Sequence, residues 1–122
     1  MRFLSRLFRR PAVTADAAKA SQAVLVHLDG ASLPSEVYAE YDLSTLEDQL
    51  IDAISEQSLG EFDGNEIGGG GAVLYMYGPD AERLFRGIES VLRAYPLCRN
   101  ARVVIRAGEP GAPEREVHLA SA

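Results

Sequence analysis

The sequence predicts an α+β fold, and three observations carry that prediction. Residues 72–77 combine β-branched and aromatic side chains as a strand does, whereas residues 81–95 place apolar side chains at helical spacings of three and four. Strand-like and helix-like segments follow one another along the chain in the order β, β, α, β, β, α, β, β. A length of 122 residues with 47% hydrophobic residues suits one domain with its own core.

The segment from residue 60 to residue 95 organises this prediction. In the strand 72–77, Val73, Tyr75 and Tyr77 share one face, and Leu74 and Met76 lie on the other. Gly78-Pro79-Asp80 then begins a helix, with proline at its first position and an aspartate near its positive end. Pro96 ends the helix, because the residue before a proline disfavours the α conformation.

A second strand is expected just upstream, around Phe62. The glycines at 68–71 join it to residues 72–77, most simply as a hairpin. Asp63-Gly64 is either the turn itself or a bulge in the first arm. The competing α+β sandwich treats residues 60–66 as a loop.

The segments before residue 60 predict two strands and one helix. Residues 21–29 read as a strand, and residues 36–42 alternate more clearly, with Val37, Ala39 and Tyr41 inward and Tyr38 outward. Ser44-Thr45-Leu46-Glu47 is a capping-box pattern, which predicts a helix ending near residue 58. The predicted solvent side of that helix carries Glu47, Asp48, Asp52 and Glu56.

The last two strands are expected at residues 102–106 and 115–119. The middle six elements, from residue 36 to residue 106, then read βαββαβ. This is the ferredoxin-like plan, an antiparallel sheet with two helices on one face, here with extra flanking strands. The open side of the sheet would carry Tyr38 and either Tyr75 and Tyr77 or Leu74 and Met76.

Charge divides the chain sharply. Residues 1–20 carry five basic and one acidic side chain, whereas residues 21–122 carry seven basic and 17 acidic ones. No Lys or Arg occurs from residue 21 to residue 82. A domain this acidic is a poor nucleic-acid binder, since phosphate contacts require clustered Lys and Arg. A basic protein partner is one interpretation of this charge, and an ordinary soluble surface, with the arginines of the second helix facing the carboxylates of the first, is the other.

Residues 1–20 are predicted to be a basic amphipathic leader and linker ahead of a single domain at 21–122. Phe3, Leu4, Leu7 and Phe8 share one helical face, and Arg2, Arg6, Arg9 and Arg10 surround it. Weak contact with a membrane surface is one expectation for residues 1–10, and a frayed leader without a role is the other. No run approaches the 18 apolar residues of a membrane span.

No candidate for chemistry stands out, so an enzyme, a metal site and a cofactor are not expected. The glycine run lacks the Gly-Lys-Ser/Thr of a phosphate loop. Asp63 and Asn65 begin like a calcium loop, but Ile67 and Leu74 stand where oxygen ligands are required. His27 and His118 would be neighbours only if the first and last strands pair. The single cysteine, Cys98, excludes an internal disulfide and fits a reducing, cytoplasmic compartment.

The stretch GEFDGNEIGGGGAVLYMYGPDAERLF and the IESVLR helix after it resemble small bacterial proteins of unassigned function. Those proteins share a GE-DGNE…LY-YGPDA-LF pattern. The resemblance covers about residues 60–108 and implies a bacterial cytosolic origin. It implies no substrate, cofactor or catalytic residue.

These observations favour a small acidic interaction domain that binds a basic protein through its first helix and open sheet face. An inhibitor or immunity role against a basic toxin or nuclease is one form of this prediction. A small-molecule-binding regulatory domain is the alternative, and a homodimer is compatible with either. The residues expected to contact the partner are Tyr38, Glu40, Glu47, Asp48, Asp52, Glu56, Tyr75 and Tyr77.

Overall fold

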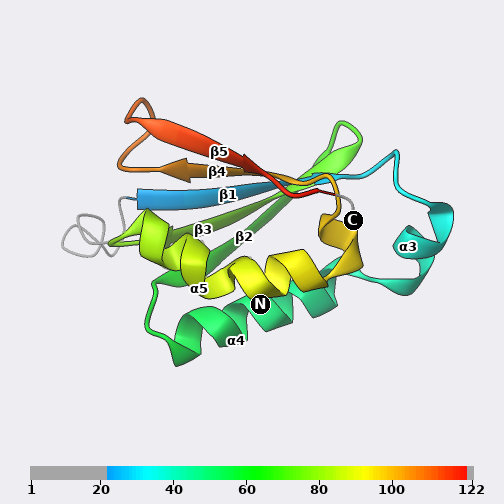
Figure 1. The fold of residues 1–122 in the computed structure, drawn as a ribbon, viewed down its shortest axis with the longest axis horizontal. Coiled ribbons are helices and arrows are strands. Elements are labelled where there is room, and N and C mark those ends of the chain that lie inside the picture. The colour runs from blue at the N-terminus through cyan, green and yellow to red at the C-terminus, as the bar shows by residue number, and fades with distance from the viewer. Residues whose placement is uncertain (1–21, 121–122) are drawn as a thin grey trace.

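A computed structural model describes residues 22–120 and confirms the α+β class. Along the chain the elements are β1 (Gln22–Asp29), α3 (Ser35–Glu40), α4 (Leu43–Glu56), β2 (Glu61–Gly68), β3 (Gly71–Gly78), α5 (Ala81–Ala94), the 3₁₀ turn η2 (Pro96–Cys98), β4 (Arg102–Arg106) and β5 (Glu114–His118) (Figure 1). The predicted leader at residues 1–20 lies outside the described residues.

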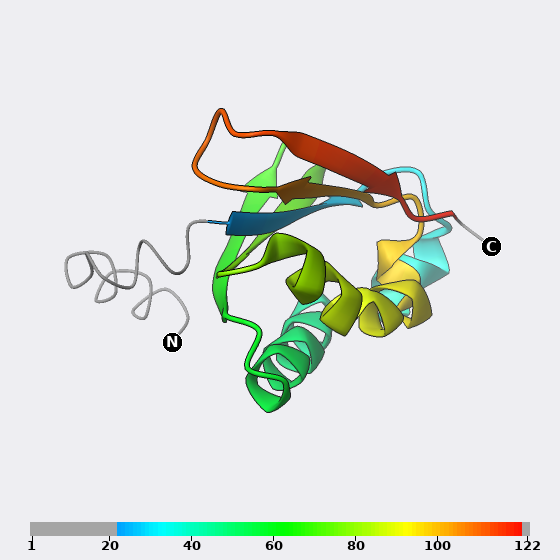
Figure 2. The same ribbon diagram turned by 60° about the vertical axis from the view of Figure 1, so that its left-hand side comes forward.

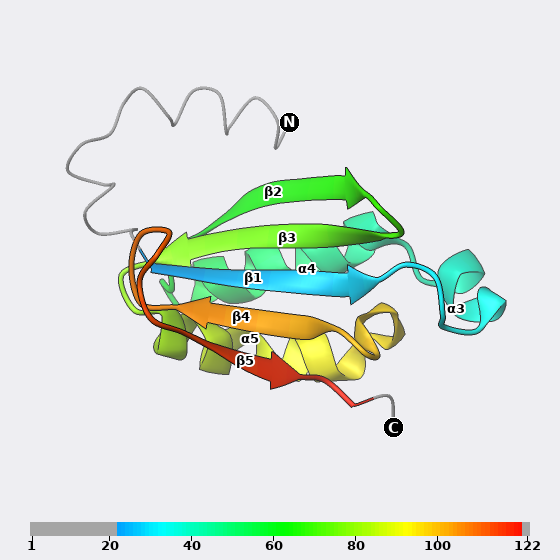
Figure 3. The same cartoon turned by 90° about the horizontal axis from the view of Figure 1, so that it is seen from above.

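The strands form one antiparallel sheet in the order β2-β3-β1-β4-β5 (Figure 3). Its centre is the pairing of β1 with β3, which runs from Gln22 opposite Gly78 to Asp29 opposite Gly71. β4 pairs with the other side of β1, and β5 pairs with β4. The strand predicted at the start of the domain therefore lies in the middle of the sheet.

The predicted hairpin at the glycine run is confirmed. Gly69 and Gly70 have φ values of 60° and 83°, and they connect β2 to β3 as a two-residue turn that requires φ > 0 at both positions. The register shifts between Phe62 and Gly64, so Asp63-Gly64 is a bulge rather than a turn. β2 extends to Gly68, which rules out the arrangement with a loop at residues 60–66.

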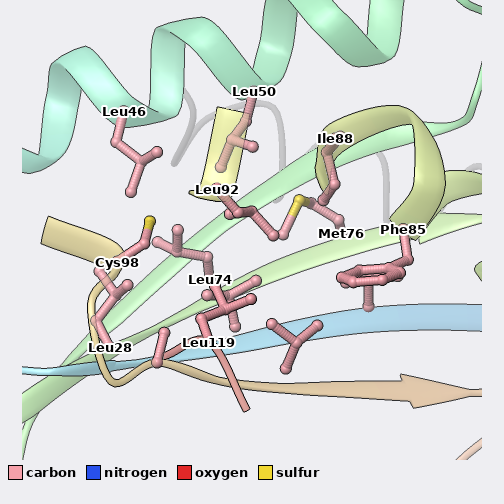
Figure 4. Close-up of a cluster of buried hydrophobic side chains, with 14 of the residues drawn as sticks. Leu28, Leu46, Leu50, Leu74, Met76, Phe85, Ile88, Leu92, Cys98 and Leu119 are labelled. Carbon is pink, nitrogen blue, oxygen red and sulfur yellow. The ribbon is translucent and has the colours of Figure 1, made fainter. Parts of the chain in front are cut away.

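α4 and α5 lie on the same face of the sheet, as Figures 1 and 2 show. The core fills the space between the helices and the sheet, and Figure 4 shows part of it. Leu46, Leu50 and Ile54 of α4 meet Leu84, Ile88 and Leu92 of α5 over the inward side chains of the strands, which include Val24, Val26, Leu74, Met76, Val103 and Ile105. Burial of these side chains is the main source of stability in such a layered fold.

The strand predicted at residues 36–42 is wrong. Residues 35–40 form the short helix α3, which lies beyond one end of the sheet (Figure 1). Val37 is buried, Tyr38 is half-buried and Ala39 is exposed, so the burial does not follow the alternation of a strand. The βαββαβ order is instead made by β1, α4, β2, β3, α5 and β4.

The helix starts differ slightly from the predicted ones. α4 begins at Leu43 with Asp42 as its N-cap, and the Asp42 carboxylate accepts a 2.8 Å hydrogen bond from the hydroxyl of Ser44. α5 begins at Ala81, where the Asp80 side chain caps the helix by accepting from the amide of Arg83. Among residues 22–120, no helix combines the length and apolar character needed to cross a membrane.

Candidate functional site

The face of the sheet opposite the helices is the candidate site, since no helix of the described chain covers it (Figures 2 and 3). Alternation along each strand decides which side chains lie there. Leu74 and Met76 are buried toward the helices, so Val73, Tyr75 and Tyr77 lie on the open face. Of the two possibilities left by the sequence, the structure selects Tyr75 and Tyr77.

The strand registers arrange this face in three rows that cross all five strands. From β2 to β5 they are Glu61, Tyr77, Ala23, Arg106 and Glu114; then Gly64, Tyr75, Leu25, Val104 and Glu116; then Glu66, Val73, His27, Arg102 and His118. On this face β3 and the adjoining part of β1 are apolar, β4 adds Arg102 and Arg106, and both outer strands contribute carboxylates. Side chains directly opposite one another on adjacent strands are close enough to interact.

We use the term apolar strip for Leu25, Val73, Tyr75 and Tyr77. Each of these four side chains is half-buried, and together they occupy the adjacent strands β1 and β3. Ala23 and Val104 continue the strip but are buried, with exposed fractions of 0% and 4%. Aromatic and aliphatic side chains gathered in this way are typical of protein contact surfaces.

The charges around the strip are not evenly distributed. On the β2 side, the Tyr75 hydroxyl donates a 2.6 Å hydrogen bond to the carboxylate of Glu66. On the β4 side, Arg102 forms a 3.0 Å ion pair with Glu116. Arg106 is buried, and its Nε donates to the carbonyl of Gly108 at 2.7 Å. The β2 side of the open face is therefore acidic, whereas the β4 side carries both signs.

The four α4 residues predicted to contact a partner lie on the other side of the sheet from Tyr75 and Tyr77 (Figure 2). Asp48, Asp52 and Glu56 are exposed, as predicted. Glu47 is buried, with 4% of its surface exposed, and its carboxylate accepts a hydrogen bond from the side-chain amide of Asn65 on β2. Its predicted place on the solvent side of the helix is therefore wrong.

Tyr38 and Glu40 lie on α3, away from the open face. The Tyr38 hydroxyl donates to the carbonyl of Asp29 at 2.8 Å and accepts from the amide of Leu33 at 3.1 Å. These two hydrogen bonds stabilise the connection between β1 and α3, so Tyr38 has a structural role there. Glu40 is exposed at the end of α3.

The two histidines are both on the open face but are not neighbours. β4 lies between β1 and β5, and Arg102 separates His27 from His118. Partial burial and, to a lesser extent, the nearby Arg102 guanidinium lower the pKa of His27 below 6.5, while Glu116 opposes this shift. Sequence reasoning did not identify Leu25, His27, Arg102 and Arg106 as residues of the open face. Alternation within β1 and within β4 shows which of them share a face of their own strand, but only the order of strands in the sheet shows that the two sets lie on the same face.

The other residues considered for metal binding or catalysis do not lie together. Asn65 pairs with Leu74 on the helix side, whereas the next residue, Glu66, lies on the open face. No group of three metal-ligating side chains occurs within residues 22–120. Cys98 is buried, and burial raises the pKa of its thiol to about 12.

A pocket of about 220 Å³ lies between the start of α5 and β4–β5, lined in part by Gln22, Glu82 and Arg115.

In comparisons with protein-family models, curated proteins and solved structures, no match to this chain was found.

Proposed function

We propose that this protein is a small cytosolic interaction domain that binds a basic protein through the open face of its sheet. The apolar strip is the observation that carries the proposal. Four half-buried side chains from two adjacent strands would be covered further by a partner, and two of them are tyrosines. Tyrosine is enriched at contact surfaces because it combines a large apolar ring with a polar hydroxyl group.

The expected sign of the partner follows from the carboxylates at the β2 edge of the domain. Glu61 and Glu66 lie along β2, and Asp48, Asp52 and Glu56 lie on α4 beneath that strand. The bond between Asn65 and Glu47 joins these two elements at the β2 edge of the domain. A partner that contacts both sets therefore extends around this edge, and an inhibitor or immunity role against a basic toxin or nuclease is one form of such binding.

We further infer a ferredoxin-like arrangement for the fold. Its support is the element order β1-α4-β2-β3-α5-β4 together with the spatial order β2-β3-β1-β4. β5 extends this arrangement beyond β4, and α3 is inserted before α4. The arrangement leaves one sheet face for binding, although the fold alone specifies no function.

The test is affinity capture from the source cells with the full chain, followed by binding measurements on the captured protein. Tyr77→Ser should weaken binding at least about tenfold, as truncation of a central aromatic side chain does. Asp52→Lys with Glu56→Lys should slow association and reduce its salt dependence. The matched control is Glu36→Lys with Glu109→Lys, which changes the net charge equally at exposed positions outside the proposed surface.

The control pair should retain wild-type affinity. A captured acidic protein, or equal binding by Tyr77→Ser and the wild type, would refute the proposal.

A further inference from the structure

We propose that residues 1–10 of the same chain bind the apolar strip on its β2 side, as an internal ligand of the open face. This inference goes beyond the proposed function and stands without it, because it concerns contact within one chain. It rests on where the chain enters the sheet, on the length of the connection, and on the match of apolar and charged side chains.

The chain enters the sheet next to the strip. β1 begins at Gln22, opposite Gly78, and the following residue, Ala23, lies opposite Tyr77. Residues 11–21 connect this point to residues 1–10 and reach about 36–40 Å when extended. The eight residues of β3 span only about 26 Å. Residues 1–10 are therefore within reach of the whole strip.

The side chains of residues 1–10 complement the strip and its acidic border. Phe3, Leu4, Leu7 and Phe8 provide apolar side chains that the strip can bury, and Arg2, Arg6, Arg9 and Arg10 provide four positive charges without one carboxylate. Glu61 and Glu66 lie on the β2 side, whereas Arg102 and Arg106 lie on the β4 side. Charge therefore favours the β2 side of the strip, where the carboxylates face no arginine across the strands, whereas on the β4 side Glu114 and Glu116 are balanced by Arg106 and Arg102.

Tethering makes even weak contact effective. A short linker holds an attached segment at an effective concentration on the order of millimolar, so a millimolar intrinsic affinity suffices to occupy the site much of the time. A second copy of the domain is a poorer occupant, because residues 21–122 carry 17 acidic and only seven basic side chains. Two such surfaces would bring like charges together.

The experiment is paramagnetic NMR on the full chain with a nitroxide at Ser5→Cys. Cys98 can stay in place because it is buried and its thiol pKa is raised to about 12, so the label attaches at residue 5. Amide signals of Leu25, Val73 and Tyr77 should lose most of their intensity. Signals of Arg86 and Arg93, which are exposed on α5 on the opposite side of the sheet, should keep theirs.

A matched pair of charge reversals locates the contact. Glu61→Lys with Glu66→Lys changes the β2 side, and Glu114→Lys with Glu116→Lys makes the same change on β5, at the other edge of the same face. The β2 pair should restore the signals at the strip at least several-fold, whereas the β5 pair should leave them broadened.

Equal effects of the two pairs, or uniform broadening over both faces, would overturn the proposal. A mixture of isotope-labelled chain without nitroxide and spin-labelled chain without isotope detects contact between chains. Broadening of the strip in that mixture would also overturn it, in favour of a second copy.

Discussion

Asn65 on the edge strand β2 donates a side-chain hydrogen bond to the carboxylate of Glu47 on α4. This bond joins the edge of the sheet to the helix beneath it, and it explains how a glutamate with 4% exposure is accommodated in the structure. Glu47 therefore differs from Asp48, Asp52 and Glu56 of the same helix, which are exposed.

We predict that Glu47→Ala lowers the free energy of unfolding by about 1–3 kcal/mol, because the Asn65 amide loses its carboxylate acceptor. Asp52→Ala, at an exposed position on the same helix, should change it by less than about 0.5 kcal/mol. Urea unfolding followed by circular dichroism measures both. Equal losses in the two variants would show that Glu47 is not a structural residue.

Gly60 should not tolerate a side chain. Its φ is 141°, and a Cβ there would lie 2.0 Å from the carbonyl oxygen of Tyr77, where the entry to β2 crosses the end of β3. We expect Gly60→Ala to cost at least about 1–3 kcal/mol in unfolding free energy. Gly68→Ala is the matched control, because nothing lies within 4 Å of its added Cβ and alanine restricts the unfolded chain. The melting temperature should fall for the first variant and stay level or rise for the second.

His27 should make the stability depend on pH below neutrality. Its pKa is lowered in the folded protein by burial and by Arg102, so the unfolded chain binds the proton more readily. Stability from this group is complete above pH 6.5 and falls as the pH drops through that value toward the folded pKa. The lowered pKa values of Asp29, Asp42 and Glu82 act near and below the ordinary values of 3.8 for the aspartates and 4.5 for the glutamate, under this window.

The measurement is the melting temperature of wild type and His27→Gln at pH 7.5 and pH 5.5. The wild type should lose more stability between the two pH values than the variant. A parallel loss in both proteins would assign the pH dependence to other groups.

Cys98 should be nearly inert in the folded protein. Burial raises the pKa of its thiol from 9.0 to about 12, which lowers the thiolate fraction at neutral pH on the order of a thousandfold. Labelling by a maleimide, followed by mass spectrometry, should be slow in native buffer and fast in 6 M guanidinium. Rapid labelling of the native protein would indicate that η2 opens frequently.

The sequence predicts the elements better than their arrangement. β3, α4, α5, β4 and the hairpin turn follow from local periodicity and turn chemistry, which act over a few residues. The sequence predicts a strand at residues 36–42 because the apolar spacing there fits both a strand and a helix. Val37 and Tyr41 are four residues apart, which places them on the same face of a helix and also on the same face of a strand. Only packing against the rest of the fold selects the helix.

The candidate site illustrates the same limit. Alternation within one strand places Tyr75 and Tyr77 on the same face but does not say which face the helices cover, and their neighbours Leu25 and Val104 depend on β1 pairing with both β3 and β4. Glu47 looks like a surface residue from helical spacing. Its burial depends on β2 lying against α4, a contact between elements that periodicity does not encode.

The two outermost strands, β2 and β5, have features that oppose the pairing of a further strand with the sheet. β5 has only five residues, of which Glu114, Arg115, Glu116 and His118 are exposed, and β2 is interrupted by its bulge at Asp63-Gly64. Short, charged or bulged edges oppose pairing with another chain's backbone. Fibrillar association through the sheet edges is thereby discouraged, so that any contact of the sheet with another chain depends on side chains rather than on backbone pairing.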